Sequence, residues 1–532
     1  MTLNRFSKGN TLRGLALAGA ALLPTLAPTA VAAEDVNLIS SDGTINIVGE
    51  FVDFTENSYV IRTALGELRL SAARVRCEGA ACPVIETTKA GLQFAGSDTV
   101  GLGIMPLLLE GYGGFLDAEV TATATGKENE LLASMVGDGG FGDELGSYLV
   151  SSSGSSDAFR ALLEKSAEIG MASRRITPNE ARALRDSGAG NMVSPENEHI
   201  VAIDSIVVVT HPDNPVKRLT MVELAGIYSG QITNWSQVGG PDLPIKVIDR
   251  SSDSGTHAVF ASNVLGDSDA PAAPNALVAD DNNEVARLVN EDPAAIGYTG
   301  YAFQRGTKAL TLVNECGLAM VPDAFSARTE EYALQRRLYL YNRADAASDQ
   351  AKDFLSYAMS KDADEVVLKS GFIDLGVESR PQPLDGDRAR QLLDPAADAY
   401  EGGLMREMLG TMVDYDRLST TFRFRTGASK LDERAVIDMA RLVEYLENKP
   451  ENAKLMFVGF TDDIGAFDSN RTLSVARAEQ VMTELQAFAG DKLAGVEMAA
   501  IGFGEIAPSA CNSSDTGRAI NRRVEVWIQS AG

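Results

Sequence analysis

Three patterns of hydrophobic and polar positions follow one another along this chain of 532 residues. Residues 35–83 alternate apolar and polar side chains in short runs, which is the period of an antiparallel sheet with one buried face. From about residue 88 to residue 376, strand-like and helix-like segments alternate, as in an α/β module long enough for two lobes. Residues 418–532 show a compact α+β pattern with amphipathic helices. We therefore expect a multidomain protein with these three modules in this order.

Several segments have patterns definite enough to assign. Residues 200–210 are mostly apolar, as in a strand buried in a parallel sheet. Helical spacing is present over residues 99–110, 220–228, 258–265 and 348–360. In the last module we expect strands near 420–424, 454–460, 496–503 and 523–528, and helices over 431–448 and 469–489. Residues 377–417 are acidic and punctuated by prolines, so we expect a linker with some helix in it.

Residues 1–33 have the pattern of a secretory signal. Three basic residues precede a run rich in Leu and Ala, and small residues come before Glu34. A membrane anchor is the alternative, but Pro24 and Pro28 interrupt a run that is shorter than the ~20 apolar residues of a membrane span. We expect an exported mature chain without a transmembrane segment, which begins with a small β accessory module over residues 34–87.

The charge of the chain excludes two classes of partner. Its 47 Lys and Arg residues against 74 Asp and Glu residues give a formal net charge of −27. Such an acidic surface repels nucleic-acid backbones and anionic lipid headgroups, so we expect neither as a ligand.

Four cysteines would face an oxidising compartment after export. Cys77 and Cys82 close a short loop, and we expect them to pair. Their spacing, with no histidine nearby, is a poor zinc signal, and we expect no metal or cofactor. Cys316 and Cys511 are far apart in the sequence, so they either bridge two domains or remain buried thiols.

Three loops of the α/β module share one design, a cluster of hydroxyl residues that leads directly into a helical segment. They span residues 96–99, 151–156 and 250–256. Hydroxyls and free backbone N–H groups at a helix start suit an oxyanion, and Arg250 adds a fork of donors that matches a tetrahedral anion. Each loop alone has another explanation, because Ser, Thr and Asp are the commonest N-caps. Three such loops with an arginine favour anion binding.

The motifs of this module resemble the periplasmic phosphate-binding protein family, the solute-binding components of phosphate ABC transporters. The resemblance covers residues 88–376 and includes Tyr-Ser-Gly-Gln-Ile-Thr-Asn-Trp at 228–235 and Arg-x-x-x-Ser-Gly-Thr at 250–256. It implies the two-lobed type II periplasmic-binding-protein fold with the anion in the cleft. By position, the residues of the binding shell would be Ser97, Thr99, Ser155, Ser156, Arg174, Arg250, Ser254, Gly255 and Thr256.

Two positions depart from the family's pattern. Most members carry an acidic residue two positions after the binding arginine, where this chain has Ser252, and an Asp where it has Arg174. Those carboxylates accept the proton of a protonated phosphate, which a proton-free anion such as sulfate cannot offer. We therefore expect phosphate as the ligand but weaker rejection of another oxyanion or a carboxylate. The alternative for Arg174 is a surface position beside Arg175.

The C-terminal module contains an acid and a base that could form a binding pair. Asp462 ends an expected strand, and Arg477 lies at the edge of the apolar stripe of the helix over 469–489. Such a pair could hold a zwitterion, with Asp taking an ammonium and Arg a carboxylate, or form a simple ion pair.

The surrounding motifs resemble those of OmpA-like peptidoglycan-binding domains. The resemblance runs over residues 418–529 and includes Gly-Phe-Thr-Asp-x-x-Gly at 459–465, although Phe460 stands where many members have His. It implies a βαβαββ fold that grips the diaminopimelate of the peptide stem through Asp462 and Arg477, supported by Asn470 and Arg523.

No motif indicates an enzyme. The three histidines are His199, His211 and His257, and no nucleophile elbow accompanies them. The expected function is capture of phosphate or a similar oxyanion in the periplasm, by a protein held at peptidoglycan and the outer membrane and working with an ABC permease or an envelope sensor. The alternative is a structural or interaction protein of the envelope whose solute-binding fold no longer binds phosphate. A wall anchor fits poorly with ordinary uptake, because a transporter subunit must diffuse to its permease.

Overall fold

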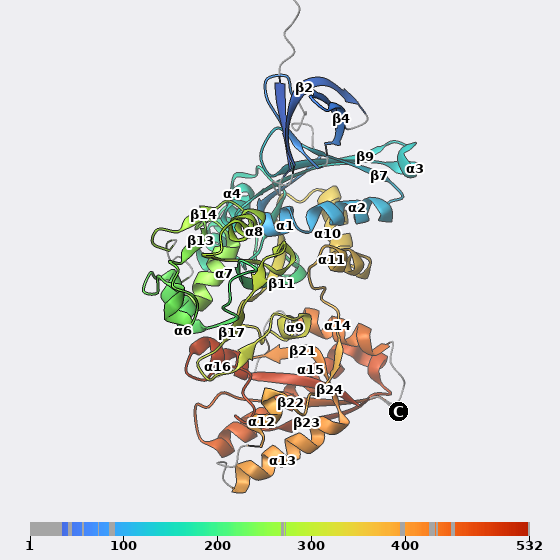
Figure 1. Cartoon of the computed structure of the whole chain (residues 1–532). Helices are drawn as coiled ribbons and strands as arrows, with labels where there is room; N and C mark the ends of the chain where they lie inside the picture. Colours follow the sequence, from blue (N-terminus) through green and yellow to red (C-terminus); the bar gives the residue numbers. More distant parts are fainter. Residues whose placement is uncertain are drawn as a thin grey trace, which may run out of the picture.

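In a computed structural model of the chain, the described residues are 35–40, 45–55, 58–72, 74–83, 91–267, 271, 273–393, 399–424, 431, 435–447 and 453–529. The expected signal, residues 1–33, lies outside them. Figure 1 shows an N-terminal sheet at one end, a two-lobed α/β module in the middle and an α+β module at the other end.

The N-terminal module is a five-stranded antiparallel sheet in the order β4-β3-β2-β1-β5. Its strands are β1 (Asp35–Ile39), β2 (Asn46–Thr55), β3 (Ser58–Thr63), β4 (Gly66–Ser71) and β5 (Arg76–Glu78). Cys77 and Cys82 form a disulfide beside the small core of this sheet. The module contacts the next one through the Ala124 N–H, which donates to the Ala72 carbonyl. An ion pair between Arg76 and Glu128, 3.3 Å apart, adds to this contact.

One sheet runs through both lobes of the α/β module, in the order β14-β13-β15-β11-β19-β10-β6-β9-β8-β7. The first lobe contains β6 (Leu92–Ser97), β7 (Glu119–Ala124), β8 (Glu130–Val136), β9 (Glu144–Ser153) and β10 (Ile169–Ala172), with α1 (Asp98–Gly101), α2 (Met105–Phe115), α4 (Ser155–Glu164), α5 (Pro178–Asp186), α10 (Asp349–Ala358) and α11 (Asp364–Lys369). The second lobe contains β13 (Lys246–Arg250), β14 (Leu277–Ala279) and β15 (Ala295–Gly300), with α6 (Met221–Tyr228), α7 (Gly255–Val264), α8 (Asn282–Glu291) and α9 (Ala324–Arg328). A small sheet of β12 (Arg218–Thr220), β17 (Thr311–Val313) and β18 (Ala319–Met320) completes the second lobe.

Two long strands, β11 (Glu198–Thr210) and β19 (Gln335–Asn342), connect the lobes. The expectation of a parallel neighbour for residues 200–210 is wrong, because β11 pairs antiparallel with both β15 and β19. The apolar run reflects burial on both faces of a strand that crosses the molecule, and burial carries no information on strand direction. The single helix expected over 99–110 is also interrupted, because α1 and α2 are separate helices.

The C-terminal module is a sheet in the order β20-β21-β24-β22-β23. Its strands are β20 (Ser379–Pro381), β21 (Asp416–Arg423), β22 (Lys454–Gly459), β23 (Glu497–Gly502) and β24 (Arg523–Gln529). The helices α14 (Ala435–Glu447) and α15 (Phe467–Ala489) share a buried cluster with the sheet, and α16 (Asp515–Asn521) precedes β24.

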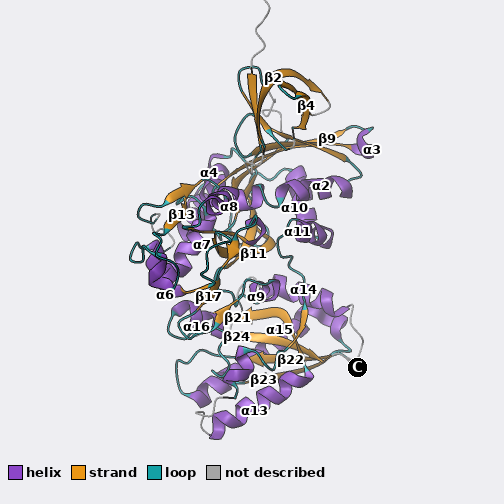
Figure 2. Ribbon diagram, viewed as in Figure 1, coloured by secondary structure: helices purple, strands orange, loops and turns teal. Residues whose placement is uncertain are grey.

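The described parts of the segment expected as a linker, residues 377–393 and 399–417, are folded onto this last module. They contain β20, α12 (Asp387–Gln391) and α13 (Ala399–Asp414), and α13 lies along β23 in Figure 2. Leu404, Met408 and Met412 are buried against Phe460 and Trp527 on that face of the sheet. The acidic composition of the segment predicted a linker and not a packed helix. A few apolar residues at helical spacing are nevertheless enough to pack α13 against the sheet.

The C-terminal module is fixed against the second lobe by covalent and ionic contacts. Cys316 and Cys511, whose state the sequence left open, form a disulfide across this boundary. Arg417 pairs with Glu331 at 2.8 Å. A further contact reaches the first lobe, where Arg441 lies 2.9 Å from Asp364. Within the described residues, no helix is long and apolar enough to cross a membrane.

Candidate functional site

Three loops meet where the two lobes face each other. From the first lobe, β6 leads to Ser97 and Thr99, and β9 leads to Ser155. Because β6 and β9 run parallel, their carboxyl ends lie at one edge of the sheet. From the second lobe, β13 ends at Arg250, and the following turn opens α7. The structure brings together the buried side chains of Ser97, Thr99, Ser155, Arg250, Ser254 and Thr256.

The loops of the two lobes are in direct contact, so the cleft is closed. The hydroxyls of Thr99 and Thr256 lie 3.3 Å apart. Gly255 approaches the first lobe so closely that a Cβ on it would lie 2.1 Å from Ser155 Oγ and 2.5 Å from Ser173 Oγ. Only glycine allows this contact, which explains the Ser-Gly-Thr sequence at the start of α7.

Arg250 is 1% exposed, and two of its three guanidinium nitrogens are occupied. Nε donates to the Ala279 carbonyl at 3.2 Å, and Nη2 donates to the Asp280 carbonyl at 3.1 Å and lies 3.2 Å from Asp98 Oδ2. Burial by itself would lower the pKa of Arg250, but the charge of Asp98 and the hydrogen bond to it more than offset this and raise it. Nη1 has no partner in the described part of the chain. A buried donor of this kind needs an acceptor.

Of the remaining hydroxyls of the expected binding shell, some have hydrogen-bond partners and one has none among the described residues. Ser155 Oγ contacts Ser173 Oγ at 3.3 Å and accepts from the Ser173 N–H at 3.0 Å. Ser254 caps α7 by accepting from the His257 N–H. Ser97 Oγ is buried and has no hydrogen-bond partner among the described residues. Ser97 and Arg250 therefore present donors from opposite lobes.

Arg174 lies at the margin of this group. Its guanidinium is held by both oxygens of Glu180, at 2.7 and 2.8 Å, and Nη2 donates to Ser156 Oγ at 3.1 Å. Burial by itself would raise the pKa of Glu180, but the hydrogen bonds and charge of Arg174 lower it. The positive charge of Arg174 is thus neutralised locally.

Sequence reasoning missed two charged residues on the connecting strands. Asp204 of β11 and Arg336 of β19 form a buried ion pair at 2.7 Å. Arg336 also donates to Thr256 Oγ1 at 2.6 Å and to Thr99 Oγ1 at 3.3 Å, so one guanidinium contacts hydroxyls from both lobes. The available signal was an Asp within the apolar run of β11 and an Arg before the apolar run of β19, since such residues are rarely buried unless paired.

His257, which follows the Ser-Gly-Thr motif, is part of a separate buried network. Its Nδ1 lies 3.1 Å from Asp249 Oδ1 and 3.0 Å from the Tyr298 hydroxyl. Tyr298 also donates to Asp249. Burial by itself would raise the pKa of Asp249, but the hydrogen bonds from His257 and Tyr298 lower it. This network anchors α7 to β13 and β15.

The C-terminal module has a second candidate site at the end of β22 and the start of α15. Asp462 Oδ2 accepts from Arg522 Nη1 at 2.6 Å. Asn470 donates to the Asp462 carbonyl at 3.2 Å and to Glu505 at 2.5 Å. Arg477 is buried on α15, its guanidinium lies over the Phe424 ring, and its Nε and Nη1 have no hydrogen-bond partner within the described residues. Burial and the charge of Arg522 lower the pKa of Arg477, against an opposing effect of Asp462.

Arg523 is not part of this second group. Its guanidinium is completely buried and donates to Glu525 at 2.8 Å and to the Ala507 carbonyl at 3.1 Å, near the boundary with the second lobe. Its neighbour Arg522 contacts Asp462 instead. Successive residues at the start of a strand point to opposite faces, so the sequence motif did not say which arginine faces the site.

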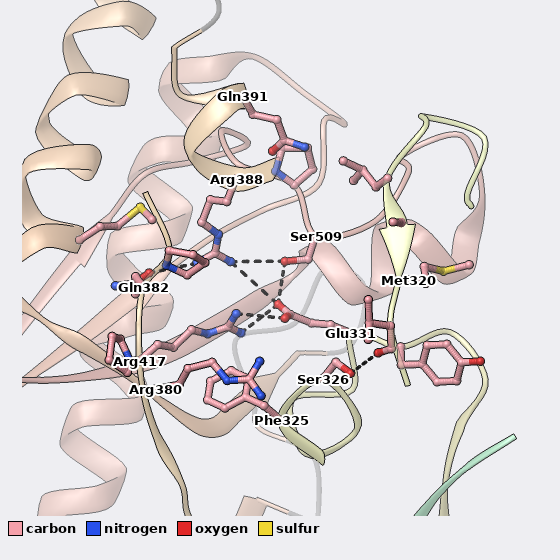
Figure 3. A pocket seen from close by; sticks show the side chains of 18 residues that line it. Met320, Phe325, Ser326, Glu331, Arg380, Gln382, Arg388, Gln391, Arg417 and Ser509 are labelled. Atoms are coloured by element: carbon pink, nitrogen blue, oxygen red, sulfur yellow. Dashed lines mark hydrogen bonds and ion pairs between the residues drawn. The ribbon is translucent and has the colours of Figure 1, made fainter. Parts of the chain in front are cut away.

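A cavity of about 330 Å³ lies at the boundary between the second lobe and the C-terminal module. Figure 3 shows Arg388 and Arg417 converging on Glu331, with Ser509 beside them. Arg388 also pairs with Glu525 at 2.6 Å. Each of these arginines already has an acidic partner. We therefore interpret the cluster as part of the contact between the second lobe and the C-terminal module. No group of His, Cys, Asp and Glu suited to a metal ion is present in the described ranges.

Comparison with known proteins assigns both larger modules. Residues 111–362 match the model of a PBP superfamily domain, and residues 423–522 match the model of the OmpA family. The phosphate-binding protein PstS of Bacillus subtilis is 30% identical over 177 residues, which cover 33% of this chain and 57% of that protein. PstS of Borreliella burgdorferi is 26% identical over 229 residues, covering 42% and 77%. An ABC-type phosphate transport receptor from Vibrio cholerae is 27% identical with a TM-score of 0.39, covering 53% of this chain and 99% of the receptor. Two family models therefore match this chain, that of a PBP superfamily domain over residues 111–362 and that of the OmpA family over residues 423–522.

Proposed function

We propose that this chain is a periplasmic solute-binding protein that captures phosphate or a similar oxyanion and is held at the peptidoglycan by its OmpA domain. The observation that carries the proposal is the pair of unpartnered, buried donors, Arg250 Nη1 and Ser97 Oγ, at the contact between the lobes. The names of the relatives from Bacillus and Borreliella support phosphate as the first ligand to test.

Binding at this cleft is non-covalent. Closing of the lobes removes water from the anion, and charge-assisted hydrogen bonds from Arg250 replace part of its hydration. The backbone N–H groups at the start of α7, at the positive end of the helix dipole, favour a bound anion there. Arg336 ties the hydroxyls of Thr99 and Thr256 together, which orients them for the ligand.

In the OmpA domain, the proposed ligand is the zwitterionic centre of a diaminopimelate stem peptide. Arg477 would take its carboxylate, and Asp462 would take its ammonium. The unpartnered nitrogens of Arg477 support this assignment, because a buried guanidinium without acceptors is costly unless a ligand provides them. Arg522 and Asn470 hold the Asp462 loop in position.

Calorimetric titration tests the first half of the proposal. Phosphate, sulfate and acetate would each be titrated into the dialysed mature chain, into Arg250→Ala and into Arg287→Ala. Arg287 is the matched control, since it is an exposed arginine of α8 in the same lobe, paired with Glu291. We expect saturable phosphate binding that Arg250→Ala loses and Arg287→Ala keeps. No binding of any of the three anions would favour the envelope structural protein instead.

Co-sedimentation with purified sacculi tests the second half. We expect Asp462→Ala and Arg477→Ala to remain in the supernatant, while the native chain and Lys454→Ala pellet with the wall. Lys454 is an exposed residue at the opposite end of β22 from Asp462, paired with Glu497. Pelleting of both site variants would contradict the assigned ligand pair. An ABC permease or an envelope sensor as partner stays a prediction.

A further inference from the structure

Asp98 of the first lobe contacts Arg250 and Asn282 of the second lobe. It lies between Ser97 and Thr99 in the sequence, and the residue is 1% exposed. One of its two oxygens, Oδ2, has three donors around it. Arg250 Nη2 is 3.2 Å away, and Asn282 approaches with its side-chain nitrogen at 2.7 Å and its backbone nitrogen at 3.2 Å.

The other oxygen, Asp98 Oδ1, is buried and accepts no hydrogen bond from the described chain. The ion pair with Arg250 accounts for a carboxylate at this position, but it is made through Oδ2 alone and leaves Oδ1 unexplained. A buried carboxylate oxygen without a donor is unfavourable by the full cost of its desolvation. The unpartnered acceptor Oδ1 therefore belongs to a carboxylate that pairs with Arg250, whose Nη1 is an unpartnered donor, and that directly follows Ser97, whose Oγ is another.

A free acceptor and two free donors on these contacting or adjacent residues define the chemistry of the ligand. The ligand must accept hydrogen bonds from Arg250 and Ser97, and it must also donate one to Asp98. Monohydrogen phosphate has both abilities at neutral pH, and arsenate shares them. Sulfate is fully deprotonated there, so it would place an oxygen against Oδ1 and meet only repulsion.

We propose that Asp98 is the residue that selects a protonated oxyanion, with Oδ2 pairing to Arg250 and Oδ1 accepting the proton of the ligand. This inference rests on the proposed anion-binding function of the cleft. It reverses the expectation of weak rejection that follows from Ser252 and Arg174. The carboxylate of Asp98, in the first loop, takes the place of the carboxylates missing at those two positions. The positive charge of Arg174 is neutralised by its ion pair with Glu180.

The main test replaces Asp98 by Asn, which keeps the shape. The amide oxygen of Asn would stay with the donors of Arg250 and Asn282, and its NH₂ would take the place of Oδ1. We expect the native chain to prefer phosphate over sulfate by about 10³-fold or more in titrations at pH 7.5. In Asp98→Asn this ratio should fall at least about 10-fold, with a gain in sulfate affinity.

The matched control is Asp281→Asn. Asp281 is a neighbouring buried carboxylate whose Oδ1 accepts from the Glu284 N–H at 2.8 Å, so it caps α8 and does not need a ligand. We expect this variant to keep the native ratio, which separates specific acceptance of a proton from a general loss of negative charge. An equal fall in both variants would overturn the role of Asp98.

A second measurement uses the unmodified chain, in case Asp98→Asn does not fold. Monofluorophosphate has the charge and shape of monohydrogen phosphate at pH 7.5, but fluorine replaces the hydroxyl, so it has no proton to donate. We expect it to bind at least about 10-fold more weakly than phosphate. Equal affinity, or equal binding of phosphate and sulfate, would overturn the inference while the cleft remained an anion site. Absence of binding by every anion would instead contradict the proposed function.

Discussion

Glu331 of the second lobe and Arg417 of the OmpA domain form a bidentate ion pair, with oxygen–nitrogen distances of 2.8 and 3.0 Å. Arg388, Arg523 and Glu525 extend this pair into a network of three guanidinium groups and two carboxylates. Together with the disulfide between Cys316 and Cys511, the network makes one unit of the second lobe and the OmpA domain.

Glu331→Gln should weaken this unit. The variant leaves three arginines facing one carboxylate, and we expect it to lower the free energy of unfolding by about 2 kcal/mol, since breaking a buried pair leaves uncompensated charge. Differential scanning calorimetry should show the transitions of the two domains moving apart. The control is Glu497→Gln, whose partner Lys454 is exposed, and it should change stability by less than about 0.5 kcal/mol. Equal effects of the two variants would argue against the network.

The same network predicts a loss of stability in acid. Burial by itself would raise the pKa of Glu331, but Arg417 and Arg388 more than offset this and lower it to about 2, from an ordinary value of 4.5. A lowered pKa in the folded state means that the carboxylate stabilises the fold above about pH 4.5 and that this contribution disappears as the pH falls toward 2. Urea titrations between pH 6 and pH 2 should therefore show the difference between the native chain and Glu331→Gln shrinking. A difference that is constant with pH would contradict the assignment.

Asp281 should have the opposite dependence. Burial and the charge of Asp98 raise the pKa of Asp281 from 3.8 to about 6, against the hydrogen bond from Glu284. Ionising this group in the folded state costs free energy that grows between pH 3.8 and pH 6 and persists above. Asp281→Asn keeps the helix cap and should stabilise the chain by about 1–3 kcal/mol at pH 7.5 and by almost nothing at pH 4. An equal gain at both values would point to a cause other than ionisation.

Arg477→Met should separate wall binding from stability. Arg477 is buried without acceptors for two of its nitrogens, which costs stability in the free protein. A methionine of similar volume should raise the free energy of unfolding by about 1 kcal/mol and abolish co-sedimentation with sacculi. Lys454→Met, at an exposed site, should change neither. A destabilised Arg477→Met chain would show that the guanidinium supports the fold instead of awaiting a ligand.

The junction also predicts which lobe moves when the cleft opens. The N-terminal sheet is attached to the first lobe, and the OmpA domain is cross-linked to the second. Spin labels at Val222 and Phe488, two exposed positions, should keep their distance when phosphate is added. Labels at Leu65 and Phe488 should change theirs, because the first lobe moves with the N-terminal sheet, and the pair of Arg441 with Asp364, which is present in the closed cleft, must be broken in the open one. A change in the first distance would contradict a fixed second lobe.

Much of the architecture was predictable because it depends on local patterns. Period-2 alternation identified the N-terminal sheet, and glycine and hydroxyl motifs identified the three loops of the cleft. The helix around Arg477 and the strand before Asp462 followed from spacing alone. The direction of β11 could not be predicted, because a strand buried on both faces looks the same in either kind of sheet. The docking of α13 was concealed by the acidic residues around its few apolar positions.

The sequence by itself determined the order of the modules, the positions of the loops and the presence of Arg250, Asp462 and Arg477, since these depend on residue type and spacing. The tertiary structure decided which of these groups have partners. Closing of the lobes brought Asp98 to Arg250 and left Oδ1 free, and the crossing strands brought Arg336 to Thr99 and Thr256. Such contacts join residues from 80 to 237 positions apart, and only the folded chain sets the distances on which their energies depend.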